Sequence, residues 1–258
     1  MTSGGIFMFK IIIPNRNNEE WLDKCLSSVF NQTYKDYEVI VVDDCSTDNS
    51  LEIIRKYPVK LIQPDHRVYN GGARNIGIRI PSDKPYTMFL DSDDWFYSND
   101  VLEKIAKHLK KNPVDCLTLQ YNCVLEDSEL LMSMERNNLH DLVNSENAAC
   151  WTKVIKTELI KEFPEATLME DTVQHINQCN YIQTMDTTTF TSIAYNRMNQ
   201  NALTSFNEKK PLKWKTSIFR LIADLIELWC PNEECEEVRQ KRLETAKNQV
   251  KEGKFIQW

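Results

Sequence analysis

Short apolar runs alternate with stretches of helical spacing between Phe9 and Asp94. The runs with the length and composition of buried strands are residues 9–13, 37–42, 59–62 and 86–90. The segments between them place apolar residues three or four positions apart, which is typical of amphipathic helices. A regular strand–helix alternation predicts a mostly parallel sheet with helices on both faces. We therefore expect an α/β fold.

Polar segments follow three of these predicted strands, at residues 14–17, 43–44 and 91–94. In parallel sheets, ligands bind outside the carboxyl ends of the strands, so the three segments are expected to converge. Clustered carboxylates suit Mg²⁺ or Mn²⁺ and, through the ion, a diphosphate. An acidic cluster can also be an ordinary turn or a helix N-cap. The shared edge favours a single binding site.

The second half of the chain has a mixed pattern. The predicted elements are strands at 117–125 and 190–195, a polar loop at 132–144 and an amphipathic helix at 151–163. Helical spacing returns at Lys213 and continues into a strongly charged segment. This pattern predicts a C-terminal helical extension over residues 206–258.

The composition is that of a soluble globular protein, with 41% hydrophobic and 27% charged residues in a chain of 258. Its 31 basic and 38 acidic residues give a net charge of -7, which does not support a general attraction to nucleic acid. No apolar run reaches the roughly 18 residues that a membrane span needs. The eight cysteines form no CxxC pair, so we expect mostly buried, reduced thiols and a cytoplasmic protein.

Several ordered motifs carry a resemblance to a known enzyme family. The matching segments are residues 11–22, 27–34, 38–44 with 46–48, 73–77 and 89–94. They resemble glycosyltransferase family two, the inverting enzymes with the GT-A fold, and in particular the capsule and lipopolysaccharide type. The resemblance implies a Rossmann-like GT-A domain over residues 9–205. Its first half, 9–100, would bind a nucleotide sugar and its second half, 101–205, the acceptor.

The resemblance assigns the acidic loop to the sugar donor. It implies that Asp91 lies near the ribose and that Asp93, with Asp91 or Asp94 beside it, coordinates Mn²⁺ or Mg²⁺. A nucleotide-diphosphate sugar, in particular a UDP-sugar, would be the donor. A divalent ion there acts as a Lewis acid and neutralises the charge that grows on the leaving diphosphate.

Other positions match the family's nucleotide-binding loops. Pro14, Asn17 and Arg74 fall in these loops, and Asp44 matches the position that reads the nucleobase, with Asp43 beside it. The pair Asp43–Asp44 also suits an Asx-turn and helix cap, which can coexist with binding.

Two further motifs lie in the second half of the chain. Glu170-Asp171 resembles the family's Glu-Asp pair, in which Asp171 would deprotonate the acceptor hydroxyl and Glu170 would bind the acceptor or orient the loop. A Glu-Asp pair is also a common helix start. Arg197 falls in a late segment that the family places near the diphosphate, where its planar fork suits phosphate oxygens. An ordinary surface arginine is the alternative.

One position departs from the family pattern. Where many relatives carry a small residue and an aromatic after the first proline, this chain has Asn15 and Arg16. A positive side chain near the nucleotide entrance would alter contacts with the base or the acceptor, unless it simply faces solvent.

The function expected from these features is metal-dependent, inverting transfer of a sugar to a hydroxyl of a glycan or a lipid-linked saccharide. The alternatives are transfer to a hydroxylated base in DNA, as in some phage enzymes, a nucleotidyltransferase, and an inactive nucleotide- or carbohydrate-binding module. A nucleotidyltransferase usually has a glycine-rich phosphate loop after the first strand, and residues 14–20 contain no glycine. The Lys- and Trp-containing segment 209–215 suits peripheral membrane association, nucleic-acid phosphates or a simple covering helix. The sequence does not indicate an oligomeric state.

Overall fold

The computed structural model describes residues 8–125, 128–132, 149–164, 170–179, 181–196 and 198–199. Arg197 and the predicted extension over 206–258 lie outside these residues, as does most of the predicted loop at 132–144. Six of the eight cysteines lie within them and all six are free, four of them buried. Among the described residues, no helix combines the length and the apolar character that a membrane span requires.

The first half of the chain alternates strands and helices as predicted. Its elements are β1 (Phe9–Asn15), α1 (Glu19–Phe30), β2 (Tyr37–Asp43), α2 (Ser50–Ile54), β3 (Lys60–Ile62), α3 (Tyr69–Arg79) and β4 (Tyr86–Phe89). The strands pair in the order β3-β2-β1-β4 and all three pairings are parallel. All these strands therefore end at one edge, where the polar segments follow them.

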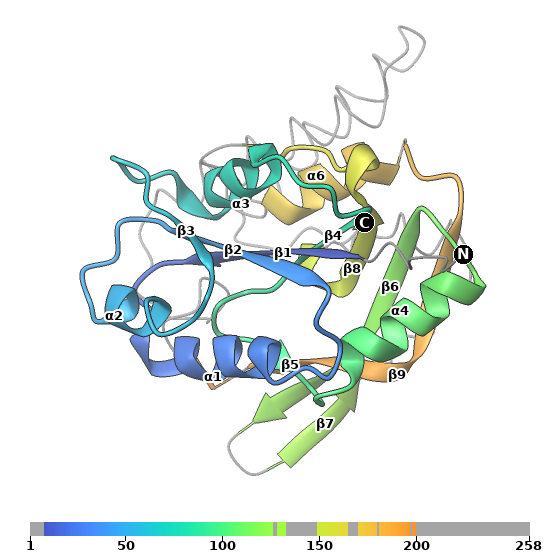
Figure 1. Ribbon diagram of the computed structural model, residues 1–258, viewed down its shortest axis with the longest axis horizontal. Helices are drawn as coiled ribbons and strands as arrows, with labels where there is room; N and C mark the ends of the chain where they lie inside the picture. Colours follow the sequence, from blue (N-terminus) through green and yellow to red (C-terminus); the bar gives the residue numbers. More distant parts are fainter. Residues whose placement is uncertain are drawn as a thin grey trace, which may run out of the picture.

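Helices cover both faces of this parallel region (Figure 1). Along β1, Ile11 and Ile13 belong to the main core with the apolar face of α1. The side chain between them, Ile12, belongs to a second cluster with Phe89 and Phe163. The alternation of side chains along the strand therefore anchors α1 on one face and the region around α3 on the other.

Helix α3 packs unusually close to β1 at Gly77. A Cβ atom at Gly77 would lie 2.5 Å from Cγ2 of Ile12. Because both partners are part of the packed interior, we expect Gly77→Ala to destabilise the protein by about 1–3 kcal/mol in urea unfolding. Adding Ile12→Ala should recover part of the loss, so strictly additive effects of the two substitutions would contradict this packing.

The second half of the chain completes a mixed sheet. Its elements are β5 (Trp95–Phe96), α4 (Val101–Lys111), β6 (Cys116–Leu125), β7 (Ser128–Met132), η2 (Cys150–Thr152), β8 (Lys153–Lys156), η3 (Thr157–Leu159), α6 (Glu170–Cys179) and β9 (Met185–Asn196). The order continues as β4-β8-β6-β9-β5, with β7 beside β6. Strand β8 runs antiparallel to both β4 and β6 and so joins the two halves.

The amphipathic helix predicted over residues 151–163 is wrong. The structure places two short 3₁₀ turns, η2 and η3, on either side of strand β8. Val154 and Ile155 are buried between β4 and β6, where β-branched side chains pack well on a pleated surface. The pairing partners are distant in sequence, so the local helical spacing was overridden. The strands predicted at 117–125 and 190–195 are confirmed within β6 and β9.

Candidate functional site

The carboxyl ends of β1 and β2 are tied together by side chains and backbone. Asn15 donates from Nδ2 to Oδ1 of Asp43 at 2.8 Å, and the backbone N–H of Asp44 donates to the carbonyl of Asn15 at 2.8 Å. Arg16 donates from Nη1 to the carbonyls of Asp44 at 2.7 Å and Cys45 at 3.1 Å. The departure at Arg16 therefore has a structural reason: its guanidinium holds the turn after β2, where Cys45 has a φ of 58°.

Asp44 holds the start of α3. Its two carboxylate oxygens accept the backbone N–H groups of Val68 at 2.7 Å and Tyr69 at 2.9 Å, and the residue is only 3% exposed. These bonds stabilise Tyr69 in the left-handed region, at a φ of 62°. Asp44 thus shapes the loop beside the β2 end, and its role in reading a base stays a prediction.

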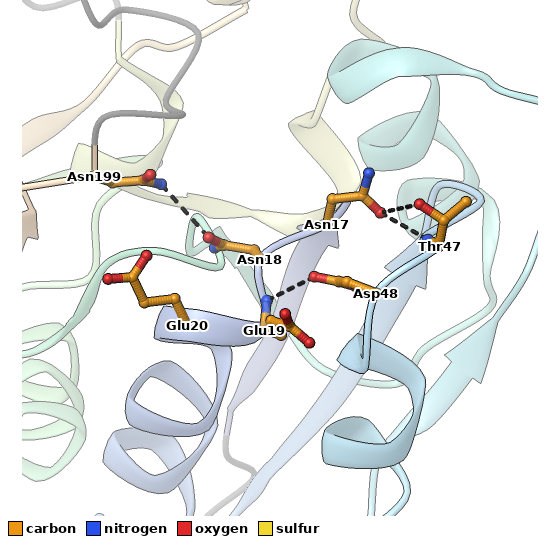
Figure 2. Close-up of a pocket in the computed structure, with 7 residues that line it drawn as sticks. All are labelled: Asn17, Asn18, Glu19, Glu20, Thr47, Asp48 and Asn199. Atoms are coloured by element: carbon orange, nitrogen blue, oxygen red, sulfur yellow. Dashed lines mark hydrogen bonds between the residues drawn. The ribbon is translucent and has the colours of Figure 1, made fainter.

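Asn17 joins the loops after β1 and β2 at a polar pocket. Its Oδ1 accepts the backbone N–H of Thr47 at 2.7 Å, and its own N–H donates to Oγ of Ser46 at 2.9 Å. The pocket measures about 270 Å³ (Figure 2), and its lining residues are Asn17, Asn18, Glu19, Glu20, Thr47, Asp48 and Asn199. Pro14 does not line this pocket: it is buried within β1, opposite Val42 of β2.

A buried arginine connects the acidic loop to α6. Arg74, on α3 and 1% exposed, donates from Nη2 to Asp91 at 2.7 Å. Its Nη1 donates to Glu170 at 2.7 Å and to Asp171 at 3.0 Å. The second oxygen of Asp171 accepts the backbone N–H of Cys150 at 3.2 Å. The two acidic motifs predicted for donor and acceptor therefore meet at one guanidinium.

The electrostatics of this cluster follow from burial and charge. Burial alone would lower the pKa of Arg74, but the carboxylates of Asp171, Asp91 and Glu170 raise that pKa well above its usual value. Burial raises the pKa of Asp91 and of Glu170, and Arg74 opposes both shifts. Three carboxylates share one guanidinium. When all three are ionised, the cluster therefore has excess negative charge, which favours a bound cation.

The other two carboxylates of the acidic loop point to different surroundings. Asp93 accepts Nδ2 of Asn199 at 2.7 Å on Oδ2, and burial together with Asp91 raises its pKa to about 6. Asp94 is 1% exposed and accepts the backbone N–H of Asn196 at 2.8 Å, while its Oδ2 is buried without a hydrogen-bond partner. Asp94 thus fastens the loop to the end of β9, and its role as a metal ligand stays a prediction.

The acidic loop fits a divalent ion that a substrate helps to bind. Within the described residues, no three His, Cys, Asp or Glu side chains form a metal site by themselves. Mg²⁺ commonly takes only one or two carboxylates, with water and substrate phosphates as its other ligands. Asp93, whose burial disfavours the charged form, and Asp91 beside it are hard oxygen donors of this type.

Some residues of this region carry no distinctive sequence signal. Asn18 donates from Nδ2 to Oγ of Ser92 at 3.0 Å, and Asn199 reaches Asp93 from 106 positions further along the chain. Asparagine is common in loops, so only the folded arrangement reveals these contacts. Arg197 lies outside the described residues, so its predicted contact with the diphosphate stays a prediction.

A match to a family model shows which protein family this chain belongs to. The model described as Glycosyl transferase family 2 matches residues 10–164, more than half of the chain. The chain belongs to glycosyl transferase family 2. The match begins in β1 and ends beyond β8, so it includes the acidic loop and Arg74. The family resemblance of the sequence is confirmed.

Curated family 2 relatives share part of their length with this chain. Glycosyltransferase GlyA of Streptococcus pneumoniae is 38% identical over 119 residues, which are 43% of this chain and 16% of GlyA. The glucosyltransferase WfgD of Escherichia coli is 27% identical over 162 residues, 61% of this chain and 63% of WfgD. The chain therefore spans less than two thirds of these relatives.

Solved structures of similar shape support the GT-A fold. Residues 1–349 of Staphylococcus aureus TarS, in complex with UDP-GlcNAc, superpose with a TM-score of 0.72 at 21% identity, covering 92% of this chain and 70% of that one. The mannosyltransferase PcManGT of Pyrobaculum calidifontis, in complex with GDP-Man and Mn²⁺, gives a TM-score of 0.55 at 16% identity, covering 85% and 62%. At these identities the likeness concerns the fold.

Proposed function

We propose that this family 2 chain is a metal-dependent, inverting glycosyltransferase. It transfers a sugar from a nucleotide-diphosphate sugar to a hydroxyl of a glycan or a lipid-linked saccharide. The observation that carries the proposal is the position of Arg74, whose guanidinium binds Asp91 of the acidic loop and both Glu170 and Asp171 of α6. A donor at the acidic loop and a base at Asp171 would thus be held beside one another.

The donor half lies at the ends of β1, β2 and β4. Asn17, Asp43 and Asp44 shape the loops where the nucleoside would lie, and Asp91 would contact its ribose. Asp93 and Asp91 would hold Mn²⁺ or Mg²⁺, which neutralises charge on the leaving diphosphate when bound. A UDP-sugar is the favoured donor, supported by the TarS complex with UDP-GlcNAc. The complex of PcManGT with GDP-Man and Mn²⁺ supports a divalent ion.

The acceptor half supplies the base. Asp171 takes the proton of the acceptor hydroxyl as that oxygen bonds to the anomeric carbon and the bond to the diphosphate breaks on the opposite face. Attack from the face opposite the leaving group inverts the configuration. Arg74 and the N–H of Cys150 fix the two oxygens of Asp171, so the carboxylate is oriented before the acceptor binds.

The names of two relatives support the proposed acceptor class. Staphylococcus aureus TarP is a poly(ribitol-phosphate) β-N-acetylglucosaminyltransferase, 38% identical over 43% of this chain and 36% of TarP. WfgD is a glucosyltransferase for α-D-GlcNAc-diphosphoundecaprenol. The two names support a hydroxyl of a polymeric or lipid-linked saccharide acceptor.

The direct test is a screen of nucleotide sugars with and without Mn²⁺. A nucleotide sugar that binds the folded chain raises its melting temperature. At a ligand concentration of 100 times Kd, the free energy of unfolding increases by about 2.7 kcal/mol. We expect stabilisation and slow donor hydrolysis by a UDP-sugar, both dependent on the ion. A chain that responds to no nucleotide sugar under either condition would contradict the proposal.

Removing the carboxylate of Asp93 should abolish ion-dependent donor binding. We expect Asp93→Ala to weaken Mn²⁺-dependent UDP-sugar binding by more than about tenfold. Loss of a residue that only hydrogen-bonds to a metal ligand already lowers metal affinity about 10–100-fold, and loss of the ligand itself should have a larger effect. Isothermal titration with and without Mn²⁺ measures the effect. The control is Asp83→Ala, which removes a side chain that is 92% exposed and lies outside this site. Ion-independent binding by the wild type would contradict the assignment.

A further inference from the structure

Asn199 lies three residues beyond the end of β9 and contacts the proposed donor region. It is 8% exposed, and its Nδ2 donates to Oδ2 of Asp93 at 2.7 Å. The same Nδ2 lies 3.5 Å from Oδ1 of Asn18, the residue before α1. Figure 2 shows Asn199 and Asn18 facing one another at the edge of the polar pocket. One amide therefore connects three segments that are far apart in the sequence.

A second amide continues this connection behind the acidic loop. Asn18 donates from Nδ2 to Oγ of Ser92, the residue before Asp93, at 3.0 Å. Ser92 is itself buried. The backbone beside Asp93 and the carboxylate of Asp93 are thus both held by hydrogen bonds that run through Asn18 and Asn199. This arrangement fixes the orientation of the carboxylate.

The hydrogen-bond donor that contacts Asp93 is a neutral amide, and this neutrality matters as much as its position. An amide N–H fixes one oxygen of Asp93 without neutralising the carboxylate, whereas a lysine or arginine there would form an ion pair that competes with a metal ion. This bond also restricts the direction in which the other oxygen of Asp93 points. Hydrogen bonds from neutral groups to ligating carboxylates commonly orient metal ligands in this way.

We propose that Asn199 is a positioning residue that orients Asp93 to bind a divalent ion together with the nucleotide diphosphate. The inference rests on the proposed function, because it assumes that Asp93 binds the ion. It adds that Asn199, which lies beyond the end of β9 in the proposed acceptor half, raises the affinity of the proposed donor half for metal. No sequence motif assigns this part to Asn199.

The test compares two substitutions that each remove an amide donor from a carboxylate. Asn199→Ala removes the bond to Asp93, and Asn49→Ala removes a bond of 2.6 Å from Nδ2 of Asn49 to Glu19. Binding of Mn²⁺ in the presence of UDP, and separately of GDP, is measured by titration of the free-Mn²⁺ EPR signal. We expect Asn199→Ala to weaken Mn²⁺ binding by about 10–100-fold and Asn49→Ala to leave it unchanged. Melting temperatures verify that both variants are folded.

One further variant separates the hydrogen bond from the bulk of the side chain. Asn199→Gln keeps an amide donor and should retain part of the affinity that Asn199→Ala loses. Unchanged or tighter Mn²⁺ binding by Asn199→Ala overturns the inference, since the amide then contributes nothing or competes with the ion. If the wild type binds no Mn²⁺ with either nucleotide, the proposed function falls together with the inference.

Discussion

Replacing Arg74 with methionine is expected to destabilise the fold by about 3–5 kcal/mol, because the buried carboxylate of Glu170 and the half-buried ones of Asp91 and Asp171 then lose the guanidinium that they share. In the native protein, Nη1 and Nη2 of Arg74 bind Asp91, Glu170 and Asp171 at 2.7 to 3.0 Å. Methionine fills a similar volume but leaves the carboxylates facing one another. Urea unfolding followed by circular dichroism measures the free energy of unfolding.

The same helix offers a matched control. Arg79 ends α3 and binds Glu162 through two bonds of 2.8 and 2.6 Å, but their side chains are 54% and 47% exposed. Solvent screens such a pair, so Arg79→Met should cost only about 0–1 kcal/mol. Equal losses from Arg74→Met and Arg79→Met would show that the buried network does not hold α3 to α6.

The loss from Arg74→Met should also depend on pH. Burial already raises the pKa of Glu170 in the folded protein, with Arg74 opposing the shift, so removal of Arg74 raises that pKa further. When the pKa of a carboxyl is higher in the folded than in the unfolded state, protonation of that carboxyl stabilises the folded state. The difference in stability between variant and wild type should therefore shrink as pH falls from about 8 to about 5. A difference that grows over this range would contradict the role of Glu170.

The proposed donor side of the molecule was the more predictable part. Periodic apolar runs indicated β1, β2 and β4, and the parallel order of these strands brings Asn15, Asp43 and the acidic loop to one edge. This inference needed only local patterns and the rule that polar segments gather at the carboxyl ends of parallel strands. The pattern could not indicate that Asp44 would be occupied by the N–H groups of Val68 and Tyr69.

The links between the two halves were not predictable from local patterns. Arg74 meets Glu170 and Asp171 across 96 and 97 positions of the sequence, and Asn199 meets Asp93 across 106. Local patterns also fail at β8, whose residues have helical spacing but pair with β4 and β6 in the folded sheet. Tertiary pairing therefore decided the structure of that segment.

The catalytic assignment depends most directly on Asp171. We expect Asp171→Asn to reduce the rate of sugar transfer by about 10²–10⁴-fold, the contribution of a positioned general base. Asparagine has nearly the same shape but does not accept the acceptor's proton. Arg74 keeps its bonds to Asp91 and Glu170 in this variant, so donor affinity and the fold should change little. Single-turnover transfer with saturating donor separates the chemical step from binding.

The contrast between rate and affinity distinguishes a base from a structural carboxylate. Asp186→Asn is the matched control, because Asp186 accepts a bond of 2.8 Å from His108 on α4. It should leave both transfer and donor binding near wild type. A structural role for Asp171, exerted through Arg74 on Asp91, would lower donor affinity and transfer together. Only a large loss of rate at unchanged donor affinity agrees with Asp171 taking the proton, because the base acts after the donor is bound.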